Sequence, residues 1–404
     1  MKTTLDRVLF SLVYIFIFSS AIGRIQYSAT TAALWINLYR LSIYLIIFLG
    51  IAYILFKHKV RFDKITILIC LMVLYEAIIS IFQYKRINIS LFNEFVIDVL
   101  AWPLIFVLTH SFIKDVGIPR SFKKITICGV FLILAITAIN LFNMDTMGIN
   151  AAIGGVTYCV AVLPLMYFFF SKKAEKILTI VVLILVMVST KRSAFLALLI
   201  GVFAYYISDA VIQEISRKKF NKMLSLMLMV FLVSIVGIYL LETSNIDIIQ
   251  KFTSGDETLS GRTILWERIL VNYGNQSFIE KLFGNGMHAV KYKINPYGLG
   301  WYAHNSFIET LYDYGVIGLI LLILFVVVII KKTVSMNMQK SKFAPVMSST
   351  IPPLLFYAFS SYFFEVGQMI LFYSFIWSLC IAVMDKGDLN QKVMSPAICR
   401  LQKL

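Results

Sequence analysis

The chain has 404 residues, of which 60% are hydrophobic and only 14% are charged, and its formal net charge is +16 at pH 7. No soluble domain needs that much apolar surface, so the composition excludes a soluble protein. Apolar runs of about 18 residues or more are long enough to cross roughly 30 Å of hydrocarbon, and such runs recur along the whole sequence.

The apolar runs predict the transmembrane helices in chain order. They lie near residues 8–23, 34–56, 65–83, 91–113, 125–142, 151–170, 177–190, 193–207, 223–241, 305–330, 345–364 and 366–384. The runs are continuous and do not alternate with polar residues, which favours helices over a β-barrel. We therefore expect an all-α, polytopic membrane protein of about 12 transmembrane helices, with residues 1–404 forming a single membrane domain.

The basic residues predict the orientation. If both termini are cytoplasmic, 25 of the 37 Lys and Arg residues fall on the inner side, as the positive-inside rule requires. This explains the net charge without a nucleic-acid partner, and we expect none. It also makes residues 242–303 a large periplasmic loop between spans nine and ten, and residues 385–404 a cytoplasmic tail.

The cysteines and the first apolar run narrow the class further. Cys70, Cys128, Cys159 and Cys380 lie in predicted spans and Cys399 lies in the inner tail, so we expect neither a disulfide framework nor a zinc site. The first run has no small-residue cleavage site, which predicts a retained span rather than a removed signal peptide.

Six Arg, Asp and Glu side chains fall inside predicted spans, where charge is costly and usually faces a cavity or a partner. They are Arg40, Glu76, Glu94, Asp98, Glu309 and Asp313. Glu94 and Asp98 are four positions apart and should share one helix face. Two interpretations stay open: a polar cavity that opens outward, or a structural set of ion pairs between Arg40 and the carboxylates.

The long polar loop is the stretch with the most hydrophilic surface. Residues 262–273 have apolar positions at helical spacing, which predicts a short helix on the membrane face. Gly284, Gly286, Gly298 and Gly300 predict tight turns after it. Loops of about 60 residues in compact proteins are usually functional or disordered, and this loop carries the chemistry-bearing groups.

Basic groups on the predicted outer side form a candidate anion site. Lys191 and Arg192 stand in a tight outer turn, Arg262 and Arg268 lie in the loop, and His304 opens span ten. Arginine offers phosphate a planar fork of donors, and a helix start adds partial positive charge. The alternatives are basic side chains that reach lipid headgroups and a surface histidine without a role. We expect no metal and no cofactor.

The ordered motifs resemble the region shared by bacterial O-antigen polymerases and O-antigen ligases. They are Gly261-Arg262 with Trp266, then Leu282-Phe283-Gly284-Asn285-Gly286, then His304-Asn305-Ser306-Phe307-Ile308-Glu309-Thr310-Leu311 with Gly315 and Gly318. The Thr190-Lys191-Arg192-Ser193 turn looks like the family's arginine at the outer end of a central span, and Gly154-Gly155 and Pro164 also fit. The resemblance covers roughly residues 150–330.

This resemblance implies a membrane glycosyltransferase of the bacterial cytoplasmic (inner) membrane whose active site faces the periplasm. The donor would be an oligosaccharide on undecaprenyl diphosphate, and the reaction would invert the anomeric carbon without a metal. Arg192 and Arg262 would bind the diphosphate, and His304 would activate the acceptor hydroxyl, although Glu365 could be the base instead. Lys191, Arg268, Asn305 and Arg40 are further candidate substrate-binding residues.

The acceptor stays open between two members of this class. A polymerase would use a lipid-linked repeat unit, and a ligase would use lipid A-core. Trp266 departs from the leucine that ligases often place there, and Asp313-Tyr314-Gly315 is nearer to polymerases, so we expect the polymerase. The product could be O-antigen or a capsular or exopolysaccharide. Expected partners are membrane lipids, a chain-length regulator and a flippase. A polysaccharide transporter or flippase is the alternative from another class.

Overall fold

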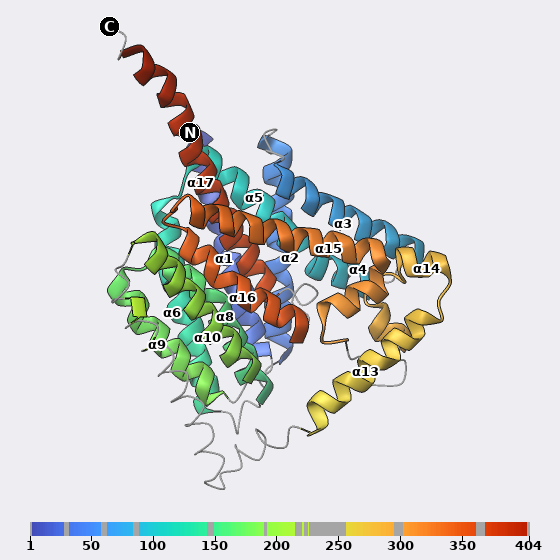
Figure 1. The fold of residues 1–404 in the computed structure, drawn as a ribbon. Coiled ribbons are helices and arrows are strands. Elements are labelled where there is room, and N and C mark those ends of the chain that lie inside the picture. Colours follow the sequence, from blue (N-terminus) through green and yellow to red (C-terminus); the bar gives the residue numbers. More distant parts are fainter. Residues whose placement is uncertain are drawn as a thin grey trace.

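The computed structural model describes residues 2–27, 32–57, 63–83, 89–143, 149–189, 192–214, 220–221, 225, 256–294, 302–360 and 368–401. All regular structure in these residues is helical, without a strand, which confirms the all-α prediction. The helices form a bundle in which both chain termini lie at the same end, called here the terminal end (Figure 1).

The helix bounds follow the apolar runs closely. The elements are α1 (Lys2–Tyr27), α2 (Ala32–Lys57), α3 (Lys64–Gln83), α4 (Ile89–Glu94), the π-helix η1 (Phe95–Leu100), α5 (Ala101–Val116), α6 (Arg120–Phe142), α8 (Ile149–Phe169), α9 (Lys172–Val188), α10 (Arg192–Ile212), α13 (Asp256–Gly274), α14 (Phe278–Phe283), the π-helix η2 (Val290–Ile294), α15 (Ser306–Met338), α16 (Ala344–Ser360) and α17 (Gln368–Leu401).

Each predicted span except the ninth has a helix in its place, and the ninth, 223–241, lies outside the described residues. Seven stretches within the described helices are long and apolar enough to cross a membrane: 4–25, 34–56, 64–83, 92–116, 120–142, 193–212 and 306–338. Residues 155–169 and 369–385 add shorter apolar helices. These helices indicate that the chain is a multi-pass membrane protein. Helix α17 also continues through the predicted tail at 385–404 as far as Leu401.

Aromatic side chains fill the centre of the bundle. Tyr14 of α1 stacks on Phe122 of α6 with ring centroids 4.0 Å apart, and both rings contact Phe375 of α17. Such pairs contribute about 0.5–1.5 kcal/mol beyond the area they bury. In lipid, helices associate mainly through close packing, so this cluster holds α1, α6 and α17 together.

The loop elements α13, α14 and η2 lie beside the bundle, against α15 and α3 (Figure 1). Leu265 and Ile269 of α13 pack with Val290, Ala303 and Tyr312 in a small separate apolar core. The helix predicted over 262–273 is confirmed within α13. The loop from 256 to 294 therefore has its own buried side chains and is held against the helices.

Candidate functional site

The glycine motif forms a tight turn that docks into a kink of α15. Gly284 and Gly286 have φ of 87° and 90°, and Gly315 has φ of 66° inside α15. A Cβ on Gly284 would lie 2.5 Å from Gly315 N, and a Cβ on Gly315 would lie 2.6 Å from Gly284 N. Glycine tolerates such φ values and such close backbone approach. Glycine is therefore needed at both positions, because the two backbones are in direct contact there.

Hydrogen bonds close this turn against α15. The carbonyl oxygen of Asp313 accepts the amides of Asn285 and Gly286, each at 2.8 Å. The buried Asp313 carboxylate accepts the Val290 amide at 3.0 Å, and Asn285 Nδ2 donates to the Tyr312 carbonyl at 3.0 Å. Asn285 and Asp313 therefore hold the loop in position. In this protein the motifs that contain them have a structural role.

Helix α3 holds the same turn from the other side. The Tyr75 hydroxyl donates to the carbonyl oxygens of Tyr314, at 2.8 Å, and Phe283, at 3.2 Å. Gln83 Nε2 donates to the Gly284 carbonyl at 2.9 Å, and the Ser80 hydroxyl accepts the Met287 amide at 3.2 Å. Polar side chains of a predicted span are thereby used to bind the loop backbone.

A charged cluster joins η2 to the α4–η1 junction. Glu94 lies 3.1 Å from His288 Nδ1 and 3.2 Å from Lys291 Nζ, and it accepts the Tyr292 hydroxyl at 3.1 Å. Asp98 lies 3.8 Å from His288 Nε2, so both carboxylates face one imidazole, as their spacing of four positions predicts. Partial burial acts to lower the pKa of Lys291, but the charge and hydrogen bonding of Glu94 and Tyr292 together raise it.

The start of α15 is capped and bent. Asn305 Oδ1 accepts the amides of Phe307 and Ile308 at 3.0 and 3.1 Å, which is N-cap geometry. His304, directly before it, has φ of 53° and is half-buried. Left-handed backbone at a residue other than glycine costs about 1–3 kcal/mol and occurs often at functional sites. Asn305 is therefore a capping residue, and its role toward a substrate stays a prediction.

Two side chains hold the segment that carries His304. Trp266 Nε1 of α13 donates to the Ala303 carbonyl at 2.5 Å, and the buried Glu309 accepts the Ala303 amide at 2.7 Å. Both backbone polar groups of Ala303 are thus bound, one from α13 and the other from α15. Trp266, which departs from the ligase pattern, fixes the backbone next to His304.

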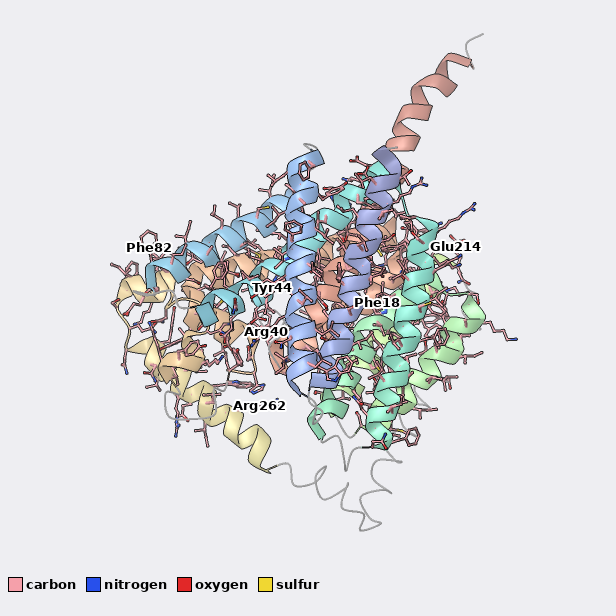
Figure 2. All side chains as sticks on the ribbon, turned by 180° about the vertical axis from the view of Figure 1, so that it is seen from behind. Phe18, Arg40, Tyr44, Phe82, Glu214 and Arg262 are labelled. Atoms are coloured by element: carbon pink, nitrogen blue, oxygen red, sulfur yellow. The ribbon has the colours of Figure 1, made fainter. Side chains whose placement is uncertain are left out.

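Arg262 connects α13 to the end of α16. Its Nη1 donates to the Ser360 carbonyl at 3.0 Å. Arg40 of α2 is exposed, and Figure 2 places Arg40 and Arg262 in the region between α13 and the body of the bundle. Arg268 is exposed on α13.

Helix packing places the start of α10 at about the same level as the end of α16, which Arg262 contacts. Ser208, late in α10, binds Asn337, which binds Ser348 early in α16, whereas Gly201 packs on Pro353. The two helices are therefore antiparallel. At 1.5 Å per residue, Arg192 and Ser360 lie about 13 Å and 10 Å beyond that contact, in the same direction. The helix begins at Arg192, whose side chain, like Lys191 and Glu365, lies outside the described residues.

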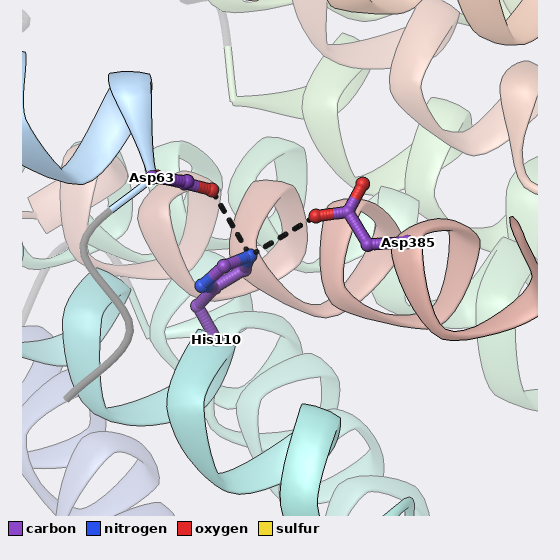
Figure 3. Close-up of side chains that lie close together, drawn as sticks. All are labelled: Asp63, His110 and Asp385. Atoms are coloured by element: carbon purple, nitrogen blue, oxygen red, sulfur yellow. Dashed lines mark ion pairs between the residues drawn. The ribbon is translucent and has the colours of Figure 1, made fainter. Parts of the chain in front are cut away.

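A second polar cluster lies where α5 and α17 approach the segment before α3 (Figure 3). The buried His110 has its Nε2 at 3.2 Å from Asp63 and 3.5 Å from Asp385, and these three are the one group in the described part of the chain with metal-ligand spacing. Lys114 and Lys332 bind Asp385 at 2.8 and 3.0 Å. The charges of two ammonium groups already balance those of the two carboxylates. We therefore interpret this cluster as a structural junction of α3, α5, α15 and α17.

Residues 177–323 match the family model described as O-antigen ligase. The resemblance to the O-antigen polymerase and ligase family is confirmed. The matched region contains the start of α10, Arg262, the glycine turn and His304. No curated protein matches the chain. A membrane enzyme of O-antigen assembly is the activity class that this match supports.

Sequence reasoning did not select His288, Lys291 or Tyr292. Their signal was present as basic and aromatic residues directly after the glycine turn, in a chain with carboxylates inside a span. It was weak because the partners, Glu94 and Asp98, stand about 200 positions earlier. The alternative that paired these carboxylates with Arg40 did not consider that the loop folds back onto α4.

Proposed function

We propose that the protein is a polysaccharide polymerase that transfers a glycan from undecaprenyl diphosphate to a hydroxyl of another lipid-linked repeat unit, at the periplasmic face of the bacterial inner membrane. The observation that supports this is the hydrogen bond from Arg262 to the end of α16. Antiparallel packing of α10 on α16 brings the start of α10, at Arg192, to about the same level of the bundle. Two arginines from distant segments suit a diphosphate, because each offers a bidentate fork.

The chemistry assigned to these residues is electrostatic. The acceptor oxygen attacks the anomeric carbon, the bond from that carbon to the diphosphate oxygen breaks with its electron pair, and the hydroxyl proton passes to a base. Negative charge grows on the leaving diphosphate, where preorganised guanidinium groups stabilise it. One displacement inverts the anomeric configuration, and we assign no metal to it.

His304 is the proposed base or orienting residue for the acceptor hydroxyl. Its peptide neighbours are fixed by Trp266, Glu309 and the Asn305 cap, so the imidazole projects from a defined backbone position. Histidine is the side chain that most often transfers protons near neutral pH. Glu365 stays the alternative base.

A second candidate function is O-antigen ligase, which would transfer the finished glycan to lipid A-core. The description of the matching family model favours it, whereas Asp313-Tyr314-Gly315 favours the polymerase. Both use the same donor, and they differ only in the acceptor.

Deleting the gene and separating the lipopolysaccharide on a gel distinguishes these candidates. Loss of a polymerase leaves core capped by a single repeat unit. Loss of a ligase leaves uncapped core and accumulated lipid-linked chains. Unchanged long-chain lipopolysaccharide, capsule and exopolysaccharide in the deletion strain would refute both.

A further inference from the structure

A buried pocket lies between α3, η1, the loop and α15. Its lining includes the polar side chains of Glu76, Asp98, His288 and Thr310 among apolar ones. Thr310 stands four positions after Ser306, the first residue of α15, so the pocket begins about 6 Å, roughly one helical turn, below the segment that carries His304.

His288 presents an unsatisfied nitrogen to this pocket. The imidazole is fully buried, and its Nε2 has no hydrogen-bond partner among the described residues. Its Nδ1 lies 3.1 Å from a Glu94 oxygen. A nitrogen lone pair would be repelled by that carboxylate, so Nδ1 carries the proton and Nε2 is an acceptor. Burial lowers the pKa of His288, which keeps the imidazole neutral.

The pocket therefore gathers several polar side chains around one small space. Asp98 lies 3.8 Å from Nε2, too far for a direct hydrogen bond but close enough to share one small ligand group. Glu76 adds a second carboxylate to the lining. Buried acceptors need donors, and the pocket admits a group no larger than a water molecule or a hydroxymethyl group. A hydroxyl group satisfies both conditions, and a phosphate satisfies neither.

We propose that this pocket is a subsite for the acceptor glycan, in which His288, Asp98 and Thr310 bind one hydroxyl or hydroxymethyl group of a sugar whose other hydroxyl reacts near His304. The inference rests on the proposed function, because that function supplies the saccharide. It adds a binding role to residues that otherwise only hold the loop, and it explains why an unsatisfied imidazole nitrogen lies next to the proposed base.

The test measures saccharide binding separately from transfer. The probe is the repeat-unit oligosaccharide released from its lipid by mild acid, titrated against the purified full-length protein in detergent and followed by saturation-transfer NMR. His288→Asn keeps a residue that tolerates left-handed backbone, and Thr310→Val and Asp98→Asn are close in shape. Each should weaken binding about tenfold, the effect of one lost hydrogen bond. Glu267→Gln, on the exposed face of α13, is the control and should bind normally.

The outcomes separate the two proposals. Equal affinity of the wild type and all three pocket variants, or no binding by the wild type, overturns the subsite. A fall in affinity confined to His288→Asn, with Thr310→Val and Asp98→Asn unchanged, also overturns it. Arg262→Ala should bind the freed oligosaccharide normally because that arginine is assigned to the donor. If Arg262→Ala still makes full-length polymer, the proposed function fails while the binding result stands.

Discussion

Gly284 and Gly315 meet backbone to backbone, each with positive φ and each without room for a side chain. Gly315→Ala or Gly284→Ala adds a methyl group that overlaps the opposite backbone. It also imposes a left-handed conformation that costs about 1–2 kcal/mol for an L-residue. We expect either change to release the loop from α15 and to abolish polysaccharide assembly.

Gly274→Ala is the matched control, since a Cβ there meets no atom within 4 Å. Limited proteolysis of membranes should cleave between 256 and 294 in the two docking variants but not in this control. Intact loops in Gly284→Ala and Gly315→Ala would contradict the proposed contact.

Arg262→Lys tests whether the planar fork of donors is needed. Lysine can still donate to the Ser360 carbonyl, but a point charge cannot grip two phosphate oxygens. We expect transfer to fall by about a hundredfold or more, as when an oxyanion-stabilising donor is lost, with protein abundance unchanged. The measurement is polymer length and amount on a gel. Arg120→Ala, an exposed arginine at the start of α6, should leave the product normal.

Replacing His304 needs two variants because the residue has a left-handed backbone. Asparagine tolerates positive φ and alanine does not, so His304→Ala combines loss of the imidazole with about 1 kcal/mol or more of strain. We expect His304→Asn to lose transfer activity while its melting temperature in detergent stays close to that of the wild type. Full activity in His304→Asn would move the base to Glu365 or another group.

The Asn305 cap predicts an effect on stability. Asn305→Ala removes the acceptor for the Phe307 and Ile308 amides and should cost about 1 kcal/mol, whereas Asn305→Ser should cost little. Thermal unfolding of the purified protein measures both. If Asn305→Ser keeps stability but loses transfer, the asparagine also contacts substrate.

Asp385 should contribute most to stability at the junction with His110. Asp385→Asn leaves Lys114 and Lys332 without their carboxylate, and hydrogen bonds to charged groups contribute about 1.5–3 kcal/mol each. We expect a clearly lower melting temperature. Lys340→Ala, which breaks the exposed pair with Glu214, should change nothing measurable. Unchanged melting of Asp385→Asn would show that the ion pairs only compensate their desolvation.

The helices were predictable because lipid requires every backbone polar group to be satisfied within a helix. Runs of apolar residues therefore report helix positions directly: α2 and α3 begin and end within two residues of the predicted spans, whereas α1 and α6 begin six and five residues earlier than predicted. The π-helix over Phe95–Leu100 was not predicted. It depends on how η1 fits between α2, α3 and the loop rather than on its own apolar pattern.

The candidate site was predictable only in part. Arg262, His304 and the glycine turn were selected from one stretch of sequence, and the turn formed. The pairing of Gly284 with Gly315, and of His288 with Glu94, depends on tertiary contacts between segments with no local signal. Only the folded loop reveals that the amides of Asn285 and Gly286 donate to the Asp313 carbonyl oxygen.

The number of residues between His304 and the kink at Gly315 sets the position of the histidine relative to the docked glycine turn. The first turns of α15, which lie between these two residues, should tolerate substitutions more readily than insertions or deletions. Inserting one residue there would rotate the histidine by about 100° around the helix axis and change its direction relative to the docked loop. Homologues of differing loop length should therefore keep this interval constant and vary elsewhere.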